Sequence, residues 1–163
     1  MIFVTVGTSK YSFPRMIDGA INFGFKYRDI KMVIQSGVYS PKLSLSSNIL
    51  IENYFSFPQT QKYIERAKLV VSHGGFGTIM QVLTSGKKPV VVPRKVKLKE
   101  HANDHQLQLT NFLAKKGIIY VESDLIDLGK YYNGKYSLAL PKDFRVSRKL
   151  LEENLIERLP PNP

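Results

Sequence analysis

A glycine-rich segment between two apolar runs is the part of the sequence best suited to chemistry. Residues 69–78 read LVVSHGGFGT, and apolar residues then continue at helical spacing with Ile79, Val82 and Leu83. An uncharged β-branched run is typical of a strand buried on both faces, so the glycines lie between a strand and a helix N-terminus. Such a junction offers unpaired backbone N–H groups and the positive end of a helix dipole. We therefore expect a phosphate site there, with glycine permitting a close approach to the backbone.

The rest of the chain alternates segments that would hold this turn in place. Strands are predicted at 2–6, 31–35, 49–54, 69–72, 89–92 and 118–121, and helices at 14–23, 59–67, 78–85 and 103–116. Gly86 and Gly117 stand where helix C-caps are expected. This alternation predicts an α/β fold, with a single Rossmann-like domain whose parallel sheet is flanked by helices. Residues 124–163 are interpreted as a C-terminal extension of this one domain, ending in a helix at 143–159.

Two further polar segments follow predicted strands, where ligands bind in such folds. The first strand runs into Gly7, Thr8 and Ser9, a small-residue turn that either binds a phosphate or simply reverses the chain. The fifth strand runs into a basic loop, RKVKLK at 94–99, and then into EHANDHQ at 100–106. The second of these stretches offers hydrogen-bond donors and acceptors to a hydroxyl-rich ligand.

Histidines and a carboxylate in this last stretch raise the question of a metal. His101, Asp104 and His105 are zinc-ligand types at short spacing. With Asn103 as the expected N-cap, however, Asp104 and His105 fall in the first helical turn and diverge. Hydrogen-bonding roles are favoured, and no metal site is predicted. His73 has two interpretations, as a general base or as a residue that braces its loop.

Composition narrows the class of protein. The chain has 163 residues, no cysteine and a net charge of +11, so one domain is expected and disulfides and thiolate chemistry are excluded. No apolar stretch is long enough to span a membrane and the start lacks a signal peptide, which predicts a cytoplasmic protein. The basic loop at 94–99 is either solvated or attracts an anionic membrane or an acidic partner. No nucleic-acid-binding pattern is present, so nucleic acid is not an expected partner.

Four motifs, in order, resemble a known family. They are VTVGT at 4–8, SHGGFGT at 72–78, GKKPVVVPR at 86–94 and HANDHQ at 101–106. The set resembles the C-terminal, donor-binding half of GT-B glycosyltransferases of the family 28 type. It is most similar to single-domain subunits, namely the catalytic subunit of the dolichol-linked UDP-GlcNAc transferase and bacterial exopolysaccharide or capsule subunits. The resemblance covers about residues 1–122.

The resemblance implies a site for a UDP-sugar made from several loops. Phe57 would pack on the uracil, Gln106 and His105 would contact the donor sugar, and position 81 would bind the ribose. Many relatives have glutamate at that position, and Gln81 would make weaker neutral hydrogen bonds. The full set implied for donor binding is Gly7, Thr8, Ser9, Phe57, His73, Gly74, Gly75, Gly77, Thr78, Gln81, His105 and Gln106, with the glycines, Thr8 and Ser9 around the diphosphate.

The resemblance also implies an activity and its partners. The chain would be the donor-binding subunit of a two-component enzyme that moves galactose or N-acetylglucosamine from a UDP-sugar to a lipid-linked saccharide, in exopolysaccharide or capsule synthesis. Catalysis would need no metal or other cofactor. A membrane-anchored glycosyltransferase subunit would supply the acceptor-binding domain and hold this chain at the inner face of the membrane. No convincing general base is found, with His73 a weak candidate.

Two other functions remain open on the sequence alone. One is a non-catalytic regulatory subunit that binds nucleotide sugars, which Gln81 favours. The other is a dinucleotide-dependent oxidoreductase. The turn lacks the full G-x-G-x-x-G pattern, and Pro93 and Arg94 follow the next strand where an acidic residue would be needed, so NAD is disfavoured.

Overall fold

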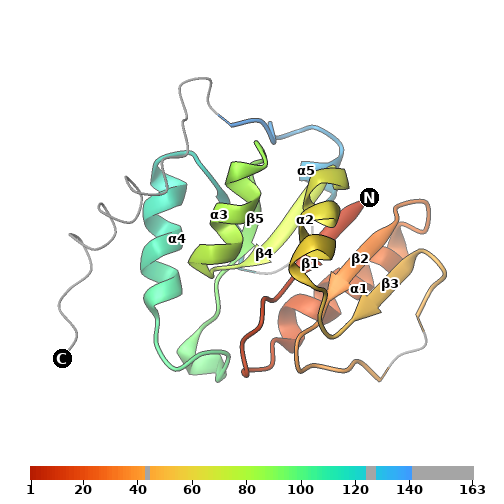
Figure 1. Ribbon diagram of the computed structural model, residues 1–163, viewed down its shortest axis with the longest axis horizontal. Coiled ribbons are helices and arrows are strands. Elements are labelled where there is room, and N and C mark those ends of the chain that lie inside the picture. Colours follow the sequence, from red (N-terminus) through yellow and green to blue (C-terminus); the bar gives the residue numbers. More distant parts are fainter. Residues whose placement is uncertain (43–44, 124–127, 141–163) are drawn as a thin grey trace.

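A six-stranded parallel sheet forms the centre of the domain. The computed structural model describes residues 1–42, 45–123 and 128–140 (Figure 1). The strands are β1 (Ile2–Thr5), β2 (Met32–Gln35), β3 (Ile49–Glu52), β4 (Leu69–His73), β5 (Val90–Val92) and β6 (Tyr120–Val121). Their order is β3-β2-β1-β4-β5-β6, and every pairing is parallel. The order reverses direction between β1 and β4, and the predicted fold class is confirmed.

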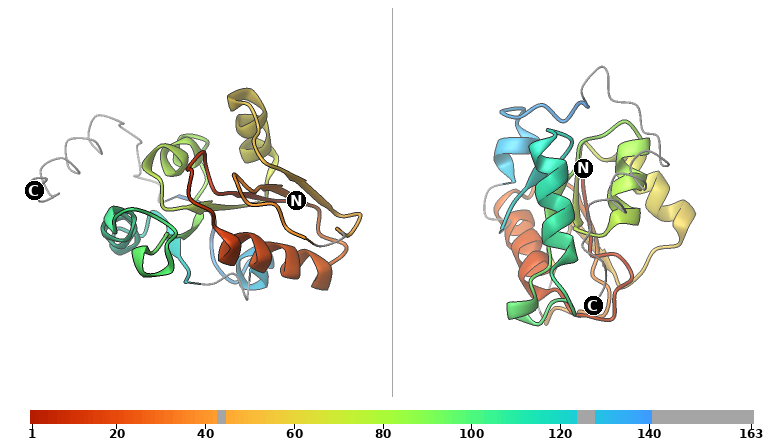
Figure 2. Two further views of the ribbon diagram at one scale, coloured as in Figure 1. Left: turned by 90° about the horizontal axis from the view of Figure 1, so that it is seen from below. Right: turned by 90° about the vertical axis from the view of Figure 1, so that its left-hand side faces the viewer.

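Helices cover both faces of this sheet. They are α1 (Pro14–Lys26), α2 (Phe57–Arg66), α3 (Phe76–Thr84), α4 (His105–Lys115) and α5 (Gly129–Tyr132), with a short 3₁₀ helix at Val96–Leu98. Figure 2 shows α1 and α5 on one face and α2 and α3 on the other. Successive side chains of β1 point to opposite faces of the sheet. Val4 packs among the buried residues of α1, and Phe3 packs against Ile64 of α2.

Element boundaries differ from the predictions where capping decides them. α2 begins at Phe57 instead of 59, because the Ser56 hydroxyl accepts from the Gln59 N–H and the Gln59 side chain accepts from the Ser56 N–H. This capping box is visible in the sequence as Ser56-x-x-Gln59 and was missed. α4 begins at His105 with Asp104 at the N-cap, so the assignment of Asn103 to the N-cap was wrong.

The helix after the glycine turn also begins earlier than predicted. α3 starts at Phe76 instead of Thr78, so Phe76 and Gly77 belong to its first turn instead of to the preceding loop. The predicted C-terminal positions of Gly86 and Gly117 are confirmed, with φ of +74° and +68° directly after the caps of α3 and α4. Five of the six predicted strands were one or two residues too long, because the sheet pairing covers less than the predicted segments, and β4 extends one residue further than predicted, to His73.

The C-terminal part is only partly described. Leu128 and Tyr131, in and next to α5, are buried in the cluster that α1 forms with the sheet. The helix predicted at 143–159 lies outside the described residues. Within the described part of the chain, no helix has the length and apolarity needed to cross a bilayer.

Candidate functional site

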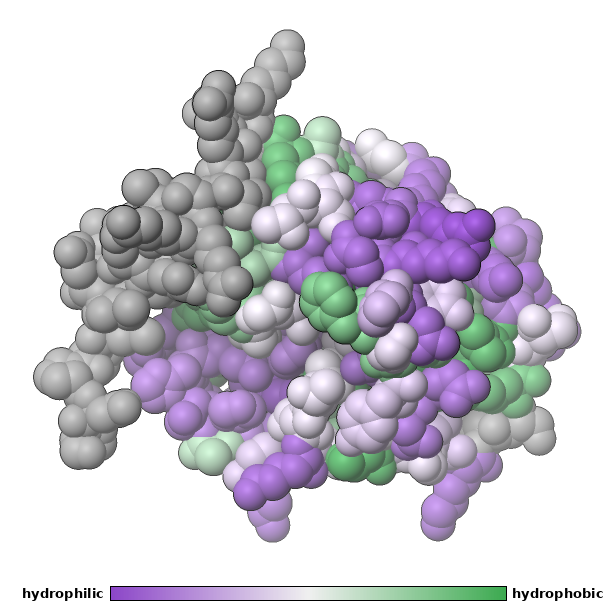
Figure 3. All heavy atoms as spheres, viewed as in Figure 1, coloured by the Kyte–Doolittle hydropathy of each residue, from purple (hydrophilic) through white to green (hydrophobic). Residues whose placement is uncertain are grey.

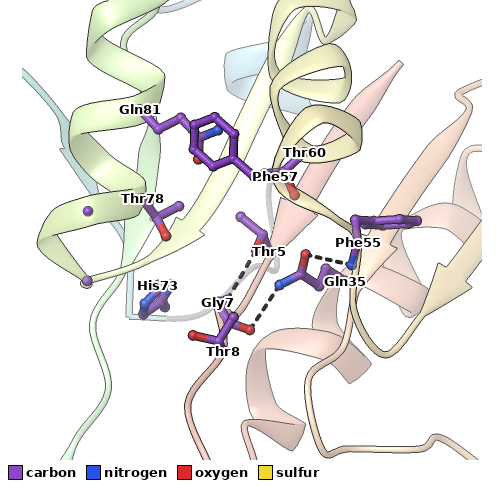
Figure 4. Close-up of a pocket in the computed structure, with 12 residues that line it drawn as sticks. Thr5, Gly7, Thr8, Gln35, Phe55, Phe57, Thr60, His73, Thr78 and Gln81 are labelled. Atoms are coloured by element: carbon purple, nitrogen blue, oxygen red, sulfur yellow. Dashed lines mark hydrogen bonds between the residues drawn. The ribbon is translucent and has the colours of Figure 1, made fainter.

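A pocket of about 370 Å³ opens at the carboxyl ends of β1 and β4 (Figure 4). Its walls are the loop after β1, the start of α2 and the start of α3. This is the position at which the strand order reverses, where α/β sheets bind ligands. The lining residues are Thr5, Gly7, Thr8, Gln35, Phe55, Phe57, Thr60, His73, Gly75, Gly77, Thr78 and Gln81.

Most of the residues predicted for donor binding meet in this pocket. Gly7, Thr8, Phe57, His73, Gly75, Gly77, Thr78 and Gln81 all line it, although they come from three separate segments. The other four predicted residues lie outside its lining, and the part of all twelve residues in donor binding stays a prediction.

Those other residues have structural contacts of their own. The Ser9 hydroxyl accepts from the Tyr11 N–H at 3.2 Å, and Gly74 lies against the Gln106 side chain. Gln106 in turn accepts from the Arg94 N–H at 3.2 Å, through Oε1. His105 is exposed at the first position of α4.

The start of α3 offers an anion site with unpaired backbone donors. Gly75 is the N-cap residue and has no side chain to cap the helix, and no other side chain of the described residues does so. The first-turn N–H groups, from Phe76 to Thr78, therefore lack helical partners. They carry the positive end of the helix dipole, and no side chain that lines the pocket is an acid or a base other than His73. The arrangement suits a diphosphate bound by neutral groups.

His73 sits between two glycines of the pocket. A Cβ at Gly7 would lie 2.4 Å from its Cε1, and a Cβ at Gly75 would lie 2.1 Å from its Nε2. Neither distance is possible for real atoms, so the imidazole fills the space that side chains would need at both positions. Gly7 also has φ of +69°, which side chains rarely adopt. The glycines of two separate turns thus leave room for the histidine between them.

The buried His73 is neutral at physiological pH. It is 8% exposed, and its Nδ1 has no hydrogen-bond partner among the described residues. Burial, together with the positive charge of Arg94, lowers its pKa from 6.5 to about 4. A base of that strength is poorly matched to proton abstraction near neutral pH. The geometry instead favours a ring that shapes the pocket and presents a neutral nitrogen to it.

Gln35 joins two walls of the pocket and was missed from the sequence. Its Nε2 donates to the Gly7 carbonyl at 2.9 Å, and its Oε1 accepts from the Phe55 N–H at 3.3 Å, as the dashed lines in Figure 4 show. It thereby fixes the turn after β1 relative to the segment that leads into α2. The available signal was an amide at the end of an otherwise apolar strand, a poor place for a polar side chain without partners. Thr5, Phe55 and Thr60 were also missed.

Beneath the pocket, a buried arginine holds two loops together. Arg94 is fully buried, and its guanidinium donates to the carbonyls of Val6, Tyr11, Ser12 and Glu100 at 2.8–3.3 Å. Burial lowers its pKa to about 10, so it remains charged. Arg94 therefore does not belong to the basic surface, which begins at Lys95, and the interpretation of 94–99 as one exposed patch was wrong at its first residue.

The acidic residue after that loop is likewise structural. Glu100 is buried and accepts two hydrogen bonds from Arg15, at 2.8 and 2.9 Å, and one from the Lys95 N–H at 3.0 Å. The expectation that this stretch as a whole serves a hydroxyl-rich ligand was therefore wrong for Glu100, whose oxygens already have partners. Asp104 accepts from the Val96 N–H, and His101 contacts Asn103. Within the described residues no three His, Asp or Glu side chains are grouped to hold a metal ion.

Comparison with known proteins agrees with this geometry. Residues 1–130 match the glycosyltransferase family 28 C-terminal domain. The chain belongs to this family. It is 30% identical over 126 residues to the human UDP-N-acetylglucosamine transferase subunit ALG13, and 28% identical over 123 residues to the mouse protein of that name. These matches cover 73% and 72% of this chain but only 11% and 10% of those relatives, so the chain spans about a tenth of their length.

Solved glycosyltransferases have the same fold. The glycotransferase of kitacinnamycin superposes with a TM-score of 0.62 at 22% identity, over 82% of this chain and 35% of that one. CalG4, the calicheamicin glycosyltransferase, superposes with a TM-score of 0.61 at 13% identity, over 96% of this chain and 37% of that one. The family 28 domain therefore has the fold of one half of a GT-B glycosyltransferase, as predicted.

Gln81 of this family 28 domain is held by a neighbouring helix. Its Nε2 donates to Oε1 of Gln61 at 3.1 Å, and Gln61 donates to Glu65 at 2.7 Å and to the Ser85 hydroxyl at 3.1 Å. A glutamate at position 81 could not donate this first bond. The amide thus connects α3 to α2 across the pocket wall, and its carbonyl oxygen is left as the acceptor for a ligand hydroxyl.

The buried His73 predicts a loss of stability in mild acid. The unfolded chain protonates this histidine near its ordinary pKa of 6.5, whereas the folded domain does so only near 4. The unfolded state therefore binds more protons in between, and stability that is complete above about pH 6.5 falls as the pH decreases toward 4. We expect His73 to contribute up to about 3 kcal/mol to this loss.

Urea unfolding at neutral pH and near pH 4 would measure this contribution. The variant His73→Asn should show a correspondingly smaller dependence on pH than the unchanged domain. His105→Asn, at an exposed position, should keep the dependence of the unchanged domain. Equal pH dependence in all three proteins would contradict the assignment to His73.

Proposed function

We propose that this domain is the donor-binding subunit of a two-component glycosyltransferase that uses a UDP-sugar. The observation that carries the proposal is the pocket between Gly7 and the open N-terminus of α3, built from neutral groups that suit a diphosphate. Membership of family 28, and a relative named as a UDP-N-acetylglucosamine transferase subunit, support UDP-sugar as the ligand. The sugar moved would be galactose or N-acetylglucosamine.

The residues of the pocket then take distinct parts in the proposal. Backbone N–H groups at the start of α3 and the turn at Gly7 and Thr8 would bind the diphosphate and stabilise charge on the departing UDP. Phe57, whose side chain is 73% exposed at the rim, would pack on the base. Gln81 would accept a hydrogen bond from the ribose. In the proposal the leaving group is stabilised without a metal ion.

A second subunit would complete the active site. The pocket has no carboxylate in its lining, and His73 is too weak a base at neutral pH. We propose that a membrane-anchored glycosyltransferase subunit supplies the acceptor-binding domain and the general base. The acceptor would be a lipid-linked saccharide of exopolysaccharide or capsule synthesis, and the complex would lie at the cytoplasmic face of the membrane.

Binding of UDP can be tested through one hydroxyl. Thr78 lines the pocket in the first turn of α3, and replacing it with valine keeps its shape but removes the hydroxyl. We expect Thr78→Val to weaken UDP binding about tenfold, the value of one hydrogen bond to a charged group, in isothermal titration calorimetry.

Thr84 on the same helix provides the matched control. Its hydroxyl bonds to the Met80 and Gln81 carbonyls of its own helix, and Thr84 does not line the pocket. Thr84→Val should leave UDP affinity unchanged. Stabilisation of the domain by NAD and not by UDP, in a thermal shift assay, would refute the proposal.

A regulatory subunit is the second proposal, and the bond between Gln81 and Gln61 favours it. This bond occupies the amide nitrogen of Gln81, the residue proposed to bind the ribose, and would lower the affinity for the nucleotide. Assays of sugar transfer with the co-expressed partner separate the two functions. Transfer that requires this chain supports the enzyme subunit, whereas UDP-sugar binding without any transfer supports regulation.

A further inference from the structure

A short loop at the carboxyl edge of the sheet exposes aliphatic and cationic side chains in alternation. This basic–aliphatic loop, residues 95–99, reads KVKLK and contains the 3₁₀ helix Val96–Leu98. Val96 is 37% and Leu98 48% exposed, and Lys97 and Lys99, on either side of Leu98, are exposed. It follows β5, so it lies at the carboxyl edge of the sheet, as the pocket does (Figure 1).

The backbone of this loop is held firmly by the domain. The Lys95 N–H donates to Glu100, the Val96 N–H to Asp104, and the Lys99 N–H to the Val96 carbonyl at 2.8 Å. Lys99 closes the turn with φ of +58°. These hydrogen bonds hold the backbone of the turn, from which Val96 and Leu98 are partly exposed to solvent.

The positive charge of the loop has few opposing groups. None of its three lysines makes an ion pair within residues 1–42, 45–123 and 128–140. Glu100 is buried and bonded to Arg15, and among the described residues Asp104 is the other acidic side chain that bonds to the loop. Exposed Lys10, in the loop after β1, adds charge to the same edge. On the face drawn in Figure 3, hydrophilic side chains project from the lower edge of the domain as it is viewed there.

Three lysines elsewhere on the domain, Lys87, Lys88 and Lys130, are bound differently. Lys87 donates to three backbone carbonyls at the end of α2, including Ala67 at 2.6 Å. Lys130 pairs with Glu122 at 2.5 Å, and Lys88 lies 3.9 Å above the ring of Tyr120. These side chains are used within the fold, whereas the lysines of the basic–aliphatic loop remain available to a partner.

We propose that the basic–aliphatic loop docks directly onto an anionic lipid surface. Val96 and Leu98 would enter the headgroup region, and the lysines would lie over lipid phosphates, each contributing about fivefold to binding. A lipid surface fits better than an acidic protein because exposed aliphatic side chains alternate with lysines in this short turn, and a bilayer offers both an apolar interior and anionic headgroups. The pocket would then face the membrane from the same edge.

Vesicle binding by the whole chain tests this proposal without any sugar nucleotide. We expect binding to vesicles of phosphatidylcholine and phosphatidylglycerol in equal parts, and little to phosphatidylcholine alone. Substituting Lys95, Lys97 and Lys99 together by glutamine should weaken this binding at least tenfold. The matched control substitutes Lys31, Lys62 and Lys115 by glutamine, which are exposed on other parts of the domain and change the net charge equally. That control should bind nearly as well as the unchanged chain.

The pair Val96→Ser with Leu98→Ser tests the aliphatic contribution. It should weaken vesicle binding several-fold and leave binding to soluble polyglutamate unchanged. An equal loss in the two lysine triples would overturn the proposal in favour of net charge alone. Unchanged vesicle binding of the serine pair would overturn it in favour of an acidic protein partner. UDP affinity of the same variants is measured separately, so failure of the docking surface is distinguished from failure of the proposed function.

Discussion

Replacing Arg94 with methionine is expected to destabilise the domain by about 3–5 kcal/mol. Methionine fills a similar space, but it donates no hydrogen bonds to the four carbonyls that the guanidinium now serves. Three of them, on Val6, Tyr11 and Ser12, are in the segment after β1, and the Glu100 carbonyl is in the loop after β5. The bonds to Val6 and Glu100 are buried and the other two are partly buried, so the loss of these donors leaves desolvated carbonyls without partners.

The comparison with an exposed arginine isolates this effect. Arg28 is exposed in the turn after α1, and Arg28→Met should change stability by no more than about 0.5 kcal/mol. Arg94→Lys keeps the charge but loses the fork that reaches several carbonyls, and should be intermediate. Chemical denaturation of the three variants gives the measurement. A small effect of Arg94→Met would mean that water replaces the lost donors and that the loops do not depend on Arg94.

Replacing Gly7 with alanine is the second change with a large expected effect, about 3–4 kcal/mol of lost stability. Two costs add at this position. The backbone has φ of +69°, which disfavours any side chain, and the new Cβ would meet the buried His73 ring at 2.4 Å. The ring is also in contact with Gly75, so it cannot move toward that side. Because Gly7 lines the pocket, UDP binding should be lost as well.

Gly86 separates these two costs. It has φ of +74° and no atom within 4 Å of an added Cβ among the described residues. Gly86→Ala should therefore lose only about 1–2 kcal/mol, the cost of the backbone conformation. The double variant Gly7→Ala with His73→Ala lacks the imidazole ring. Its stability, measured by thermal and urea unfolding, should recover part of the difference between the losses in Gly7→Ala and Gly86→Ala. If Gly7→Ala and Gly86→Ala were equally stable, the contact with His73 would have no energetic role.

The glycine turn shows how far sequence reasoning reached. Its β-branched run and its glycines predicted a strand and a helix, and β4 and α3 confirm both, whereas the phosphate site between them stays a prediction. On the sequence alone, the presence of glycine at these positions is explained only by the close approach of a ligand. The structure adds a second cause, because Gly7 and Gly75 also leave room for the imidazole of His73. No spacing rule could show this, since Gly7 and His73 are 66 positions apart in the chain.

Charged residues were the harder class to interpret. Arg94 and Lys95 are adjacent in a basic segment, yet one is fully buried and the other belongs to the surface. Sequence shows only that both are cations. The burial of Arg94 depends on the carbonyl groups that other loops bring to its guanidinium. It depends also on Phe13, whose ring centroid lies 4.5 Å from the guanidinium carbon.

The sequence by itself determined the α/β class, the elements and the family, because hydrophobic periodicity, caps and ordered motifs are local properties of the chain. It also predicted that Gly7, Thr8, Phe57 and the α3 turn would share one site. Only the tertiary structure decided that Gln35 ties the walls of that site, that His73 is buried and neutral, and that Arg94 is a buried link between loops. These outcomes depend on desolvation and on partners distant in sequence, which exist only once the sheet has brought its carboxyl edge together.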